Sequence, residues 1–288
     1  MLNDPAVLKK LAGIREIPTL PEVMHNVMIV LASEDSAAGD LADVLSTDQA
    51  LCSKILKVAN SAFFAQSRRI FDISDAIVLL GFDSIAQLAL ATTVFSAFGP
   101  IRSSQRFDMN GFWEHSIATA IASKAIADTI GEPSDSKLLY TAGLLHDIGK
   151  LLLITRFPVQ YVSVFEKAES GDLFLHEAEQ HVLGFTHCDT GEWVCDRWNF
   201  PKRLIRLIGD HHSASCPGPC ADPEACIVWL ANIICNRLHM GNSGNTKGYG
   251  LDQSEYSGIG LKPGDMDKIT DKLESSRSQI ESILKAME

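Results

Sequence analysis

Apolar residues recur along this chain at the three- and four-residue spacing of α-helices, and no stretch alternates polar and apolar residues long enough to predict a sheet. Polar or Pro/Gly-containing breaks such as Ser33–Ser36 and Gly99-Pro100 interrupt this spacing. The pattern therefore predicts an all-α protein. We expect helices over about 21–32, 37–46, 47–59, 73–80, 85–98, from 109 or 110 onward, 138–154, 159–170, 173–183, 189–198, 201–212, 224–240 and 266–287.

The breaks in this pattern also predict how the chain is organised. We expect an N-terminal helical half over 1–99 and a second helical half over 100–240. Residues 241–264 are rich in glycine, serine and asparagine, which is typical of a flexible loop. An amphipathic helix over 265–288 closes the chain.

The stretch Leu138–Ile154 is apolar almost all the way round, as expected of a helix buried on every side. It nevertheless contains His146, Asp147 and Lys150. Burying a carboxylate beside an imidazole is unfavourable unless each is paired or bound to a metal. Adjacent helical positions diverge by about 100°, so the His-Asp pair would converge only on a shared centre such as a metal ion.

A simpler interpretation treats this stretch as a capped helix end. Gly149 would terminate the helix, and Lys150 would lie at its negative pole. This interpretation leaves the buried histidine and aspartate unexplained. Four further histidines make a metal centre the better hypothesis, because a set of core histidines around one aspartate is typical of metal ligation. They are His115, His187, His211 and His212.

Composition narrows the classes of partner. The 288 residues carry a net charge of −11, which disfavours nucleic acid and anionic membranes. The amino-terminal sequence does not resemble a signal peptide, and seven cysteines spread through the chain resemble reduced thiols, so we expect a cytoplasmic protein. Cys216, Cys220 and Cys226 lie in a Pro/Gly-rich segment and are interpreted as loop residues, while Cys188 and Cys195 are interpreted as small core residues.

Several ordered motifs resemble the HDOD family, the HD-related output domains of bacterial signalling proteins, and more distantly the HD-type phosphohydrolases. The resemblance covers roughly Leu11 to Leu238. The matching segments are Ile17-Pro-Thr-Leu-Pro-Glu22, Ala59-Asn-Ser-Ala-Phe-Phe64, Ala76-Ile-Val-Leu-Leu-Gly-Phe82, Trp113-Glu-His-Ser116, Gly143-Leu-Leu-His-Asp-Ile-Gly-Lys150, Glu179 to His187, and Trp198-Asn-Phe-Pro201 running to His212.

The resemblance implies an HD-like helical bundle with an additional N-terminal helical subdomain. It implies that Asp147 bridges two metals, with His115 and His146 on one and His187, His211 and His212 on the other. Asp147 and Lys150 would be the catalytic residues, Lys150 approaching a phosphate oxygen while a metal-bound water attacks. The nitrogen and oxygen ligands suit Fe, Mn, Ni or Zn.

The chain departs from the enzyme pattern in two places. Asn232 stands where HD enzymes have a metal-binding aspartate, so we expect one tightly held metal and a second only at partial occupancy. Ser213 follows the paired histidines, and Gly248-Tyr-Gly250 comes too late to replace the Gly-Tyr-Pro motif, which disfavours cyclic-dinucleotide phosphodiesterase activity.

Two functions follow from this comparison. We expect a bacterial regulatory protein of signal transduction that retains a transition-metal site and acts on a protein partner. The alternative is a metal-dependent phosphohydrolase acting on a phosphorylated small molecule or nucleotide. On the sequence alone, Asp147→Ala is expected to remove the metal with little loss of helix content.

Overall fold

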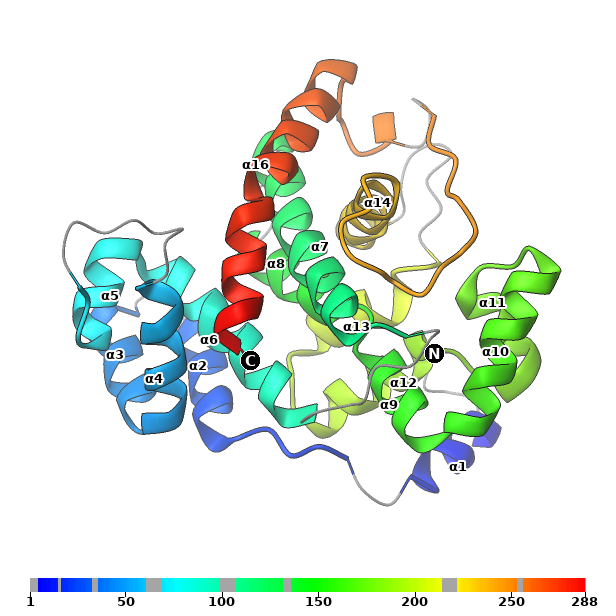
Figure 1. Cartoon of the computed structure of the whole chain (residues 1–288), viewed down its shortest axis with the longest axis horizontal. Coiled ribbons are helices and arrows are strands. Elements are labelled where there is room, and N and C mark those ends of the chain that lie inside the picture. Colours follow the sequence, from blue (N-terminus) through cyan, green and yellow to red (C-terminus); the bar gives the residue numbers. More distant parts are fainter. Residues whose placement is uncertain are drawn as a thin grey trace. The chain divides into compact units, whose positions relative to one another are not determined.

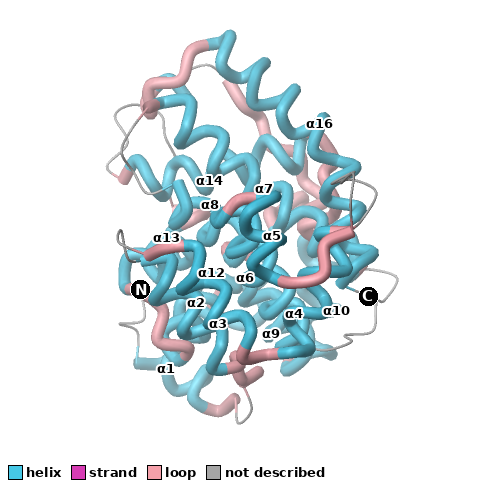
Figure 2. Tube along the Cα trace, turned by 90° about the vertical axis from the view of Figure 1, so that its left-hand side faces the viewer, coloured by secondary structure: helices cyan, strands magenta, loops and turns pink. Residues whose placement is uncertain are grey.

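The computed structural model describes residues 5–14, 17–32, 36–60, 69–98, 107–131, 136–213, 222–252 and 256–287. These residues form helices joined by loops, with no β-strand among them (Figures 1 and 2). The all-α prediction is confirmed. The chain divides into two compact units, one of residues 1–17 and 101–275 and the other of residues 18–100 and 276–288. Residues 1–17 therefore group with residues 101–275 and not with the N-terminal half, and residues 276–288 group with residues 18–100.

The second unit holds five consecutive helices and the end of the last helix. They are α2 (Glu22–Ala32), α3 (Ala38–Ser46), α4 (Gln49–Ala59), α5 (Ile73–Leu80) and α6 (Phe82–Phe98). The Asp48 side chain caps α4 by accepting a hydrogen bond from Leu51 N, as Asp and Thr residues at this position do. At the other end of α4, the Asn60 amide pairs with both backbone groups of Ile70 at 2.8 Å. This amide ties the end of α4 to the residues before α5.

The first unit contains every predicted site residue. Its helices are α1 (Pro5–Ala12), α7 (Met109–Ile130), α8 (Ser136–Leu145), α9 (Ile148–Arg156), α10 (Pro158–Gly171), α11 (Leu175–Leu183), α12 (His187–Arg197), α13 (Lys202–Asp210), α14 (Pro223–Arg237) and the start of α16 (Pro263–Met287). Helix α7 packs against α8 and α14, and α9 packs against α12 (Figure 1). Helix α1, which the hydrophobic pattern did not predict, buries Val7 and Leu11 against the core formed by α9 to α12.

The continuous helix predicted over Leu138–Ile154 is wrong. Helix α8 ends at Leu145 and α9 begins at Ile148, so His146 and Asp147 form the turn between them. The simpler capped-end interpretation is also wrong about Gly149, which lies inside α9. Since both residues stand outside regular helix, the 100° divergence of helical neighbours does not apply, and both side chains point to one centre.

The span Ser136–Arg156 is the one segment of the described chain long and apolar enough to cross a membrane by length and composition, and 83% of its apolar 18-residue window is buried inside the protein. Such burial is typical of a core helix in a globular protein.

The end of α13 also differs from the helix predicted over 201–212. Helix α13 ends at Asp210, and His211 and His212 follow its last turn.

Gly149 allows α9 and α12 to cross closely. A Cβ added there would lie 2.0 Å from His187 O and 2.7 Å from Gly191 N, and both are backbone atoms that cannot rotate away. The absence of a side chain at Gly149 thus sets the position of the first turn of α12, which carries His187.

We predict that Gly149→Ala lowers the free energy of unfolding by about 3 kcal/mol, since backbone atoms must move to admit the methyl group. Urea denaturation measures this. Gly39→Ala is the matched control: Gly39 lies in α3 with nothing within 4 Å of the added Cβ, so the same substitution should stabilise by up to about 1 kcal/mol. Equal effects at the two positions would contradict the close-crossing account.

Candidate metal centre

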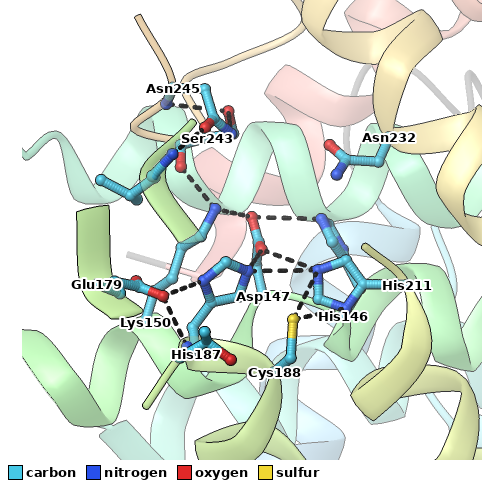
Figure 3. Close-up of polar contacts among 12 residues, drawn as sticks. His146, Asp147, Lys150, Glu179, His187, Cys188, His211, Asn232, Ser243 and Asn245 are labelled. Carbon is cyan, nitrogen blue, oxygen red and sulfur yellow. Dashed lines mark hydrogen bonds and ion pairs between the residues drawn. The ribbon is translucent and has the colours of Figure 1, made fainter. Parts of the chain in front are cut away.

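The predicted site residues come together inside the first unit from five places in the chain. His115 comes from α7, the His146-Asp147 pair from the turn, and Lys150 from α9, while His187 opens α12 and His211-His212 follow α13. Figure 3 shows the Asp147 carboxylate in the middle of the group. Their ligand atoms fall into two groups that could hold a metal, one of His187, Cys188, His211 and His212, and one of His115, His146 and Asp147.

Asp147 Oδ1 faces two imidazole nitrogens. His187 Nε2 lies 3.3 Å from it and His211 Nε2 lies 3.7 Å from it, while the two nitrogens are 3.3 Å apart. All three side chains are fully buried. Although these contacts are short enough for ion pairs, Asp147 Oδ1 has no directed hydrogen bond from any described residue.

Backbone and side-chain acceptors fix which ring nitrogens of this group carry hydrogen. His187 Nδ1 donates to Glu179 Oε2 at 2.6 Å, and His211 Nδ1 donates to Ile208 O at 2.6 Å. Since both partners are acceptors, the Nε2 atoms present lone pairs to the carboxylate when the rings are neutral, which is the state in which histidine binds a metal. In that state three lone pairs converge in a buried space and repel one another unless a positive charge, either a ring proton or a metal ion, lies between them.

The geometry of this triangle fits a metal ion. With sides of 3.3, 3.3 and 3.7 Å, its in-plane centre lies about 2.0 Å from each corner, which is the length of a metal–nitrogen or metal–oxygen bond. His212 Nε2 is buried nearby without a hydrogen-bond partner among the described residues. The residues present therefore fit a transition metal at Asp147 Oδ1, His187 and His211.

A buried carboxylate, Glu179, orients His187. It accepts hydrogen bonds from His187 N at 2.7 Å, from His187 Nδ1 at 2.6 Å and from Tyr161 Oη at 2.5 Å. A carboxylate that holds the outer nitrogen of a ligating histidine fixes the ring and makes it a better ligand. The sequence match included Glu179 within a segment, but gave it no role.

We predict that Glu179→Gln weakens metal binding by about 10- to 100-fold, because the amide cannot accept all three hydrogen bonds. Competition with a chromophoric chelator measures the affinity. Tyr161→Phe is the control, since it removes one donor to Glu179 and leaves both contacts to His187 in place. A larger effect of Tyr161→Phe than of Glu179→Gln would contradict this assignment.

The other carboxylate oxygen already has a cationic partner. Lys150 Nζ lies 2.7 Å from Asp147 Oδ2, on the side where His146 Nε2 lies 3.2 Å away. A second metal bound at Oδ2 would be close to this ammonium group, and like charges in a buried site repel strongly. Lys150 is thus a second reason, besides Asn232, to expect weak metal binding at the second position.

Asn232 lies where the sequence comparison placed it. Its Oδ1 is 3.0 Å from His115 Nε2 and accepts a hydrogen bond from Asn236 Nδ2 at 2.7 Å. A neutral amide here leaves the His115, His146 and Asp147 group with one carboxylate, so it attracts a divalent cation less than an aspartate would.

Lys150 also joins the centre to the segment that follows α14. Its ammonium group donates to Ser243 O at 2.8 Å (Figure 3). Ser243 Oγ donates to Asn236 Oδ1 at 2.6 Å. Asn242 N donates to Gly111 O, and Asn245 Oδ1 accepts from Leu175 N. The beginning of the glycine-rich segment is therefore bonded to α7, α9, α11 and α14. Lys150 is 1% exposed, so its ammonium group is closed off from solvent.

Burial and charge act on the histidines in opposite directions. Burial lowers the pKa of His115 to about 3 and holds that of His212 well below its usual value, so both are neutral at pH 7. Burial alone would also lower the pKa of His187 and His211. Glu179, Cys188 and Asp147 instead raise the pKa of His187 well above its usual range, and Cys188 and Asp147 raise that of His211 to about 9. His146 and Lys150 overcome burial to hold the pKa of Asp147 well below its usual value.

Several neighbours of the centre had no role in the sequence analysis. The most important is Cys188, which was interpreted as a small core residue. Its sulfur lies in the possible ligand group of His187, His211 and His212. His176 stacks on His212 with ring centroids 4.2 Å apart, and Tyr249 stacks on Phe174 at 4.5 Å. No spacing rule places these side chains beside the histidines, because they come together only through the packing of α11, α12 and the segment after α14.

The cysteines correct one expectation. Cys226 is disulfide-bonded, so the prediction that all seven cysteines are reduced thiols is wrong there. Cys52, Cys188 and Cys195 carry free thiols. Cys216 and Cys220 lie outside the described residues.

Comparison with known proteins supports the fold. An HDOD domain protein of unknown function from Geobacter sulfurreducens is 23% identical, with a TM-score of 0.78 over 98% of this chain and 97% of that chain. A candidate phosphohydrolase from Shewanella amazonensis SB2B is 23% identical, with a TM-score of 0.75 over the whole of both chains. A candidate signal transduction protein from Marinobacter aquaeolei VT8 is 24% identical, with a TM-score of 0.81 over 98% of this chain and 64% of that chain.

Sequence comparison gives the family. An uncharacterized protein of Treponema pallidum (strain Nichols) is 24% identical over 200 residues, which are 69% of this chain and 38% of that protein. The chain therefore matches well under half the length of this relative. The HDOD domain profile matches residues 17–214, more than half of the chain and including His115, Asp147, His187 and His211. The chain belongs to the HDOD domain family.

Proposed function

We propose that this chain is a regulatory HDOD protein of signal transduction that holds one transition metal at Asp147, His187 and His211. One observation carries the proposal: three fully buried ligand atoms lie at mutual distances that a metal ion of ordinary bond length would satisfy. The bound metal would supply a fixed positive charge that holds the turn after α8 and the first turns of α9 and α12 together.

Lys150 links the metal centre to the segment that follows α14. In the structure Asp147 Oδ2 and Ser243 O share its ammonium group. A metal on Oδ1 would draw negative charge away from Oδ2 and leave Lys150 more strongly bonded to Ser243. The segment 241–252 would then differ in stability between the metal-bound and metal-free protein, and a signalling protein partner in the cytoplasm would recognise that difference.

The burial of the centre favours regulation over catalysis. His115, His146, Asp147, His187 and His211 are fully buried, and Lys150 is 1% exposed. A substrate phosphate could reach Lys150 only after the hydrogen bonds of Ser243 break. A metal ion buried in this way is better suited to stabilising one conformation of the protein than to catalysis, because a catalytic site must admit substrate and release product at each turnover.

The second candidate function is phosphoester hydrolysis, favoured by the second ligand group of His115, His146 and Asp147. A pair of metals sharing Asp147 would be able to activate a water for attack on a phosphorylated small molecule or nucleotide. Lys150 would then have to leave Ser243 to approach the phosphate oxygen.

Hydrogen exchange and turnover separate the two functions. We expect metal loading to slow amide exchange over residues 241–252, to increase capture of a specific protein from a host lysate, and to give no turnover of bis(p-nitrophenyl) phosphate. Ser243 offers its backbone carbonyl to Lys150, so Lys150→Met is the matched variant and should abolish the effect of metal on exchange. Turnover that requires both Asp147 and metal, with exchange unchanged by metal, would favour the hydrolase.

A further inference from the structure

Cys188 lies at the metal centre and is not a residue of the ligand set expected from the family. It directly follows His187 in the first turn of α12. Its sulfur is 3.8 Å from His211 Nδ1 and 4.0 Å from His211 Nε2, it is buried, and it carries a free thiol. The ligand atoms of His187, Cys188, His211 and His212 all lie within 4.8 Å of one another.

The sulfur lies close to a ligand position. In a tetrahedral site with bonds of about 2.1 Å to nitrogen and 2.3 Å to sulfur, the two ligand atoms are about 3.6 Å apart. The observed 4.0 Å between Cys188 Sγ and His211 Nε2 exceeds this by a few tenths of an ångström. Because the sulfur lies nearer to Nδ1 than to Nε2 of His211, the Cys188 side chain must also turn toward the Nε2 side of the ring to share a metal with it.

A second observation points to the same place. Asp147 Oδ1 is fully buried, has no directed hydrogen bond from the described residues, and faces His187 and His211, whose ligand atoms lie within 4.8 Å of the Cys188 sulfur (Figure 3). A divalent ion with one carboxylate, one thiolate and two neutral imidazoles is electrically neutral. Charge balance of this kind is what a buried site in a low-dielectric interior requires.

We propose that Cys188 is the fourth ligand of this metal, which makes the centre a thiolate, carboxylate and bis-imidazole site selective for zinc. The inference rests on the proposed function, since it requires that a transition metal binds at Asp147, His187 and His211. On binding, Cys188 Sγ and the Nε2 atoms of His187 and His211 give up any proton they carry to solvent, and the sulfur forms the bond to the metal. Thiolate and imidazole ligands favour zinc and cobalt, whereas manganese and magnesium favour oxygen ligands.

Cobalt(II) is the probe that tests this, because only a thiolate ligand gives an intense sulfur-to-cobalt charge-transfer band in the near ultraviolet. The full chain is stripped with a chelator and titrated with Co²⁺. We expect the band in the native protein and its loss in Cys188→Ala, with cobalt and zinc affinity lowered by at least about 10-fold and manganese affinity little changed. Cys188→Ser keeps the side-chain shape, and it replaces the alanine variant if that variant fails to fold.

Cys195→Ala is the matched control. Cys195 lies on the same helix, is fully buried and has a free thiol, but it does not belong to the ligand group. It should leave the charge-transfer band and the affinity unchanged. Cobalt binding without the band, at equal affinity in Cys188→Ala, would overturn the thiolate ligand and leave the metal site standing. No cobalt binding by the native protein would overturn both this inference and the proposed function.

Discussion

Asp147→Ala should lower the free energy of unfolding by about 3 to 5 kcal/mol even without metal, since it leaves Lys150 as a buried charge without its carboxylate. Lys150 Nζ lies 2.7 Å from Asp147 Oδ2, and both side chains are inaccessible to solvent. The sequence alone predicted that this substitution removes metal with little loss of helix content. The buried ion pair changes that expectation. Urea denaturation of the chelator-treated protein measures the effect.

The double variant separates the ion pair from other causes. Lys150→Met added to Asp147→Ala removes the unpaired charge and should recover at least half of the lost stability. Lys150→Met alone should be destabilising as well, since it leaves the carboxylate beside two imidazoles without its cation. Additive losses in the double variant would show that the two side chains do not stabilise each other.

Metal removal should lower stability by a comparable amount. At a free metal concentration about 1,000-fold above the Kd, a ligand that binds only the folded state adds about 4 kcal/mol. Zinc-loaded and chelator-treated protein should therefore differ in thermal unfolding by several degrees or more. Differential scanning calorimetry at fixed protein concentration measures the difference.

His211→Ala is the control for this prediction. It removes one corner of the ligand triangle and leaves the Asp147–Lys150 pair intact. Its unfolding should be nearly independent of metal, whatever its stability without metal. If the native protein unfolds identically with and without chelator, the metal has no part in holding the turn after α8 to α12.

The hydrophobic pattern predicted most of the helices because each has a buried face with helical spacing. It failed at His146-Asp147, where the residues on both sides are apolar and buried. The break is only two residues long and no polar loop accompanies it, so the apolar spacing on its two sides was interpreted as one helix. Helix α1 was missed for a related reason, since its eight residues carry only Val7 and Leu11 as buried positions.

The candidate ligands could be predicted from the sequence because histidine and aspartate are rarely buried without a purpose, and their order resembles a known family. Cys188 could not be recognised, since a buried cysteine is far more often a small apolar residue than a ligand. The role of Lys150 was equally hidden. Its partner Ser243 contributes a backbone carbonyl, which any residue carries, and it lies 93 positions away in the chain.

Metal content tests the central claim most directly. The full chain is purified without added metal and analysed for its elements, beside His211→Ala as the matched variant. We predict about one equivalent of a transition metal per native chain, with any second metal well below one equivalent, and little in the variant. Less than about a tenth of an equivalent in the native protein, with no uptake on reconstitution, would contradict the account.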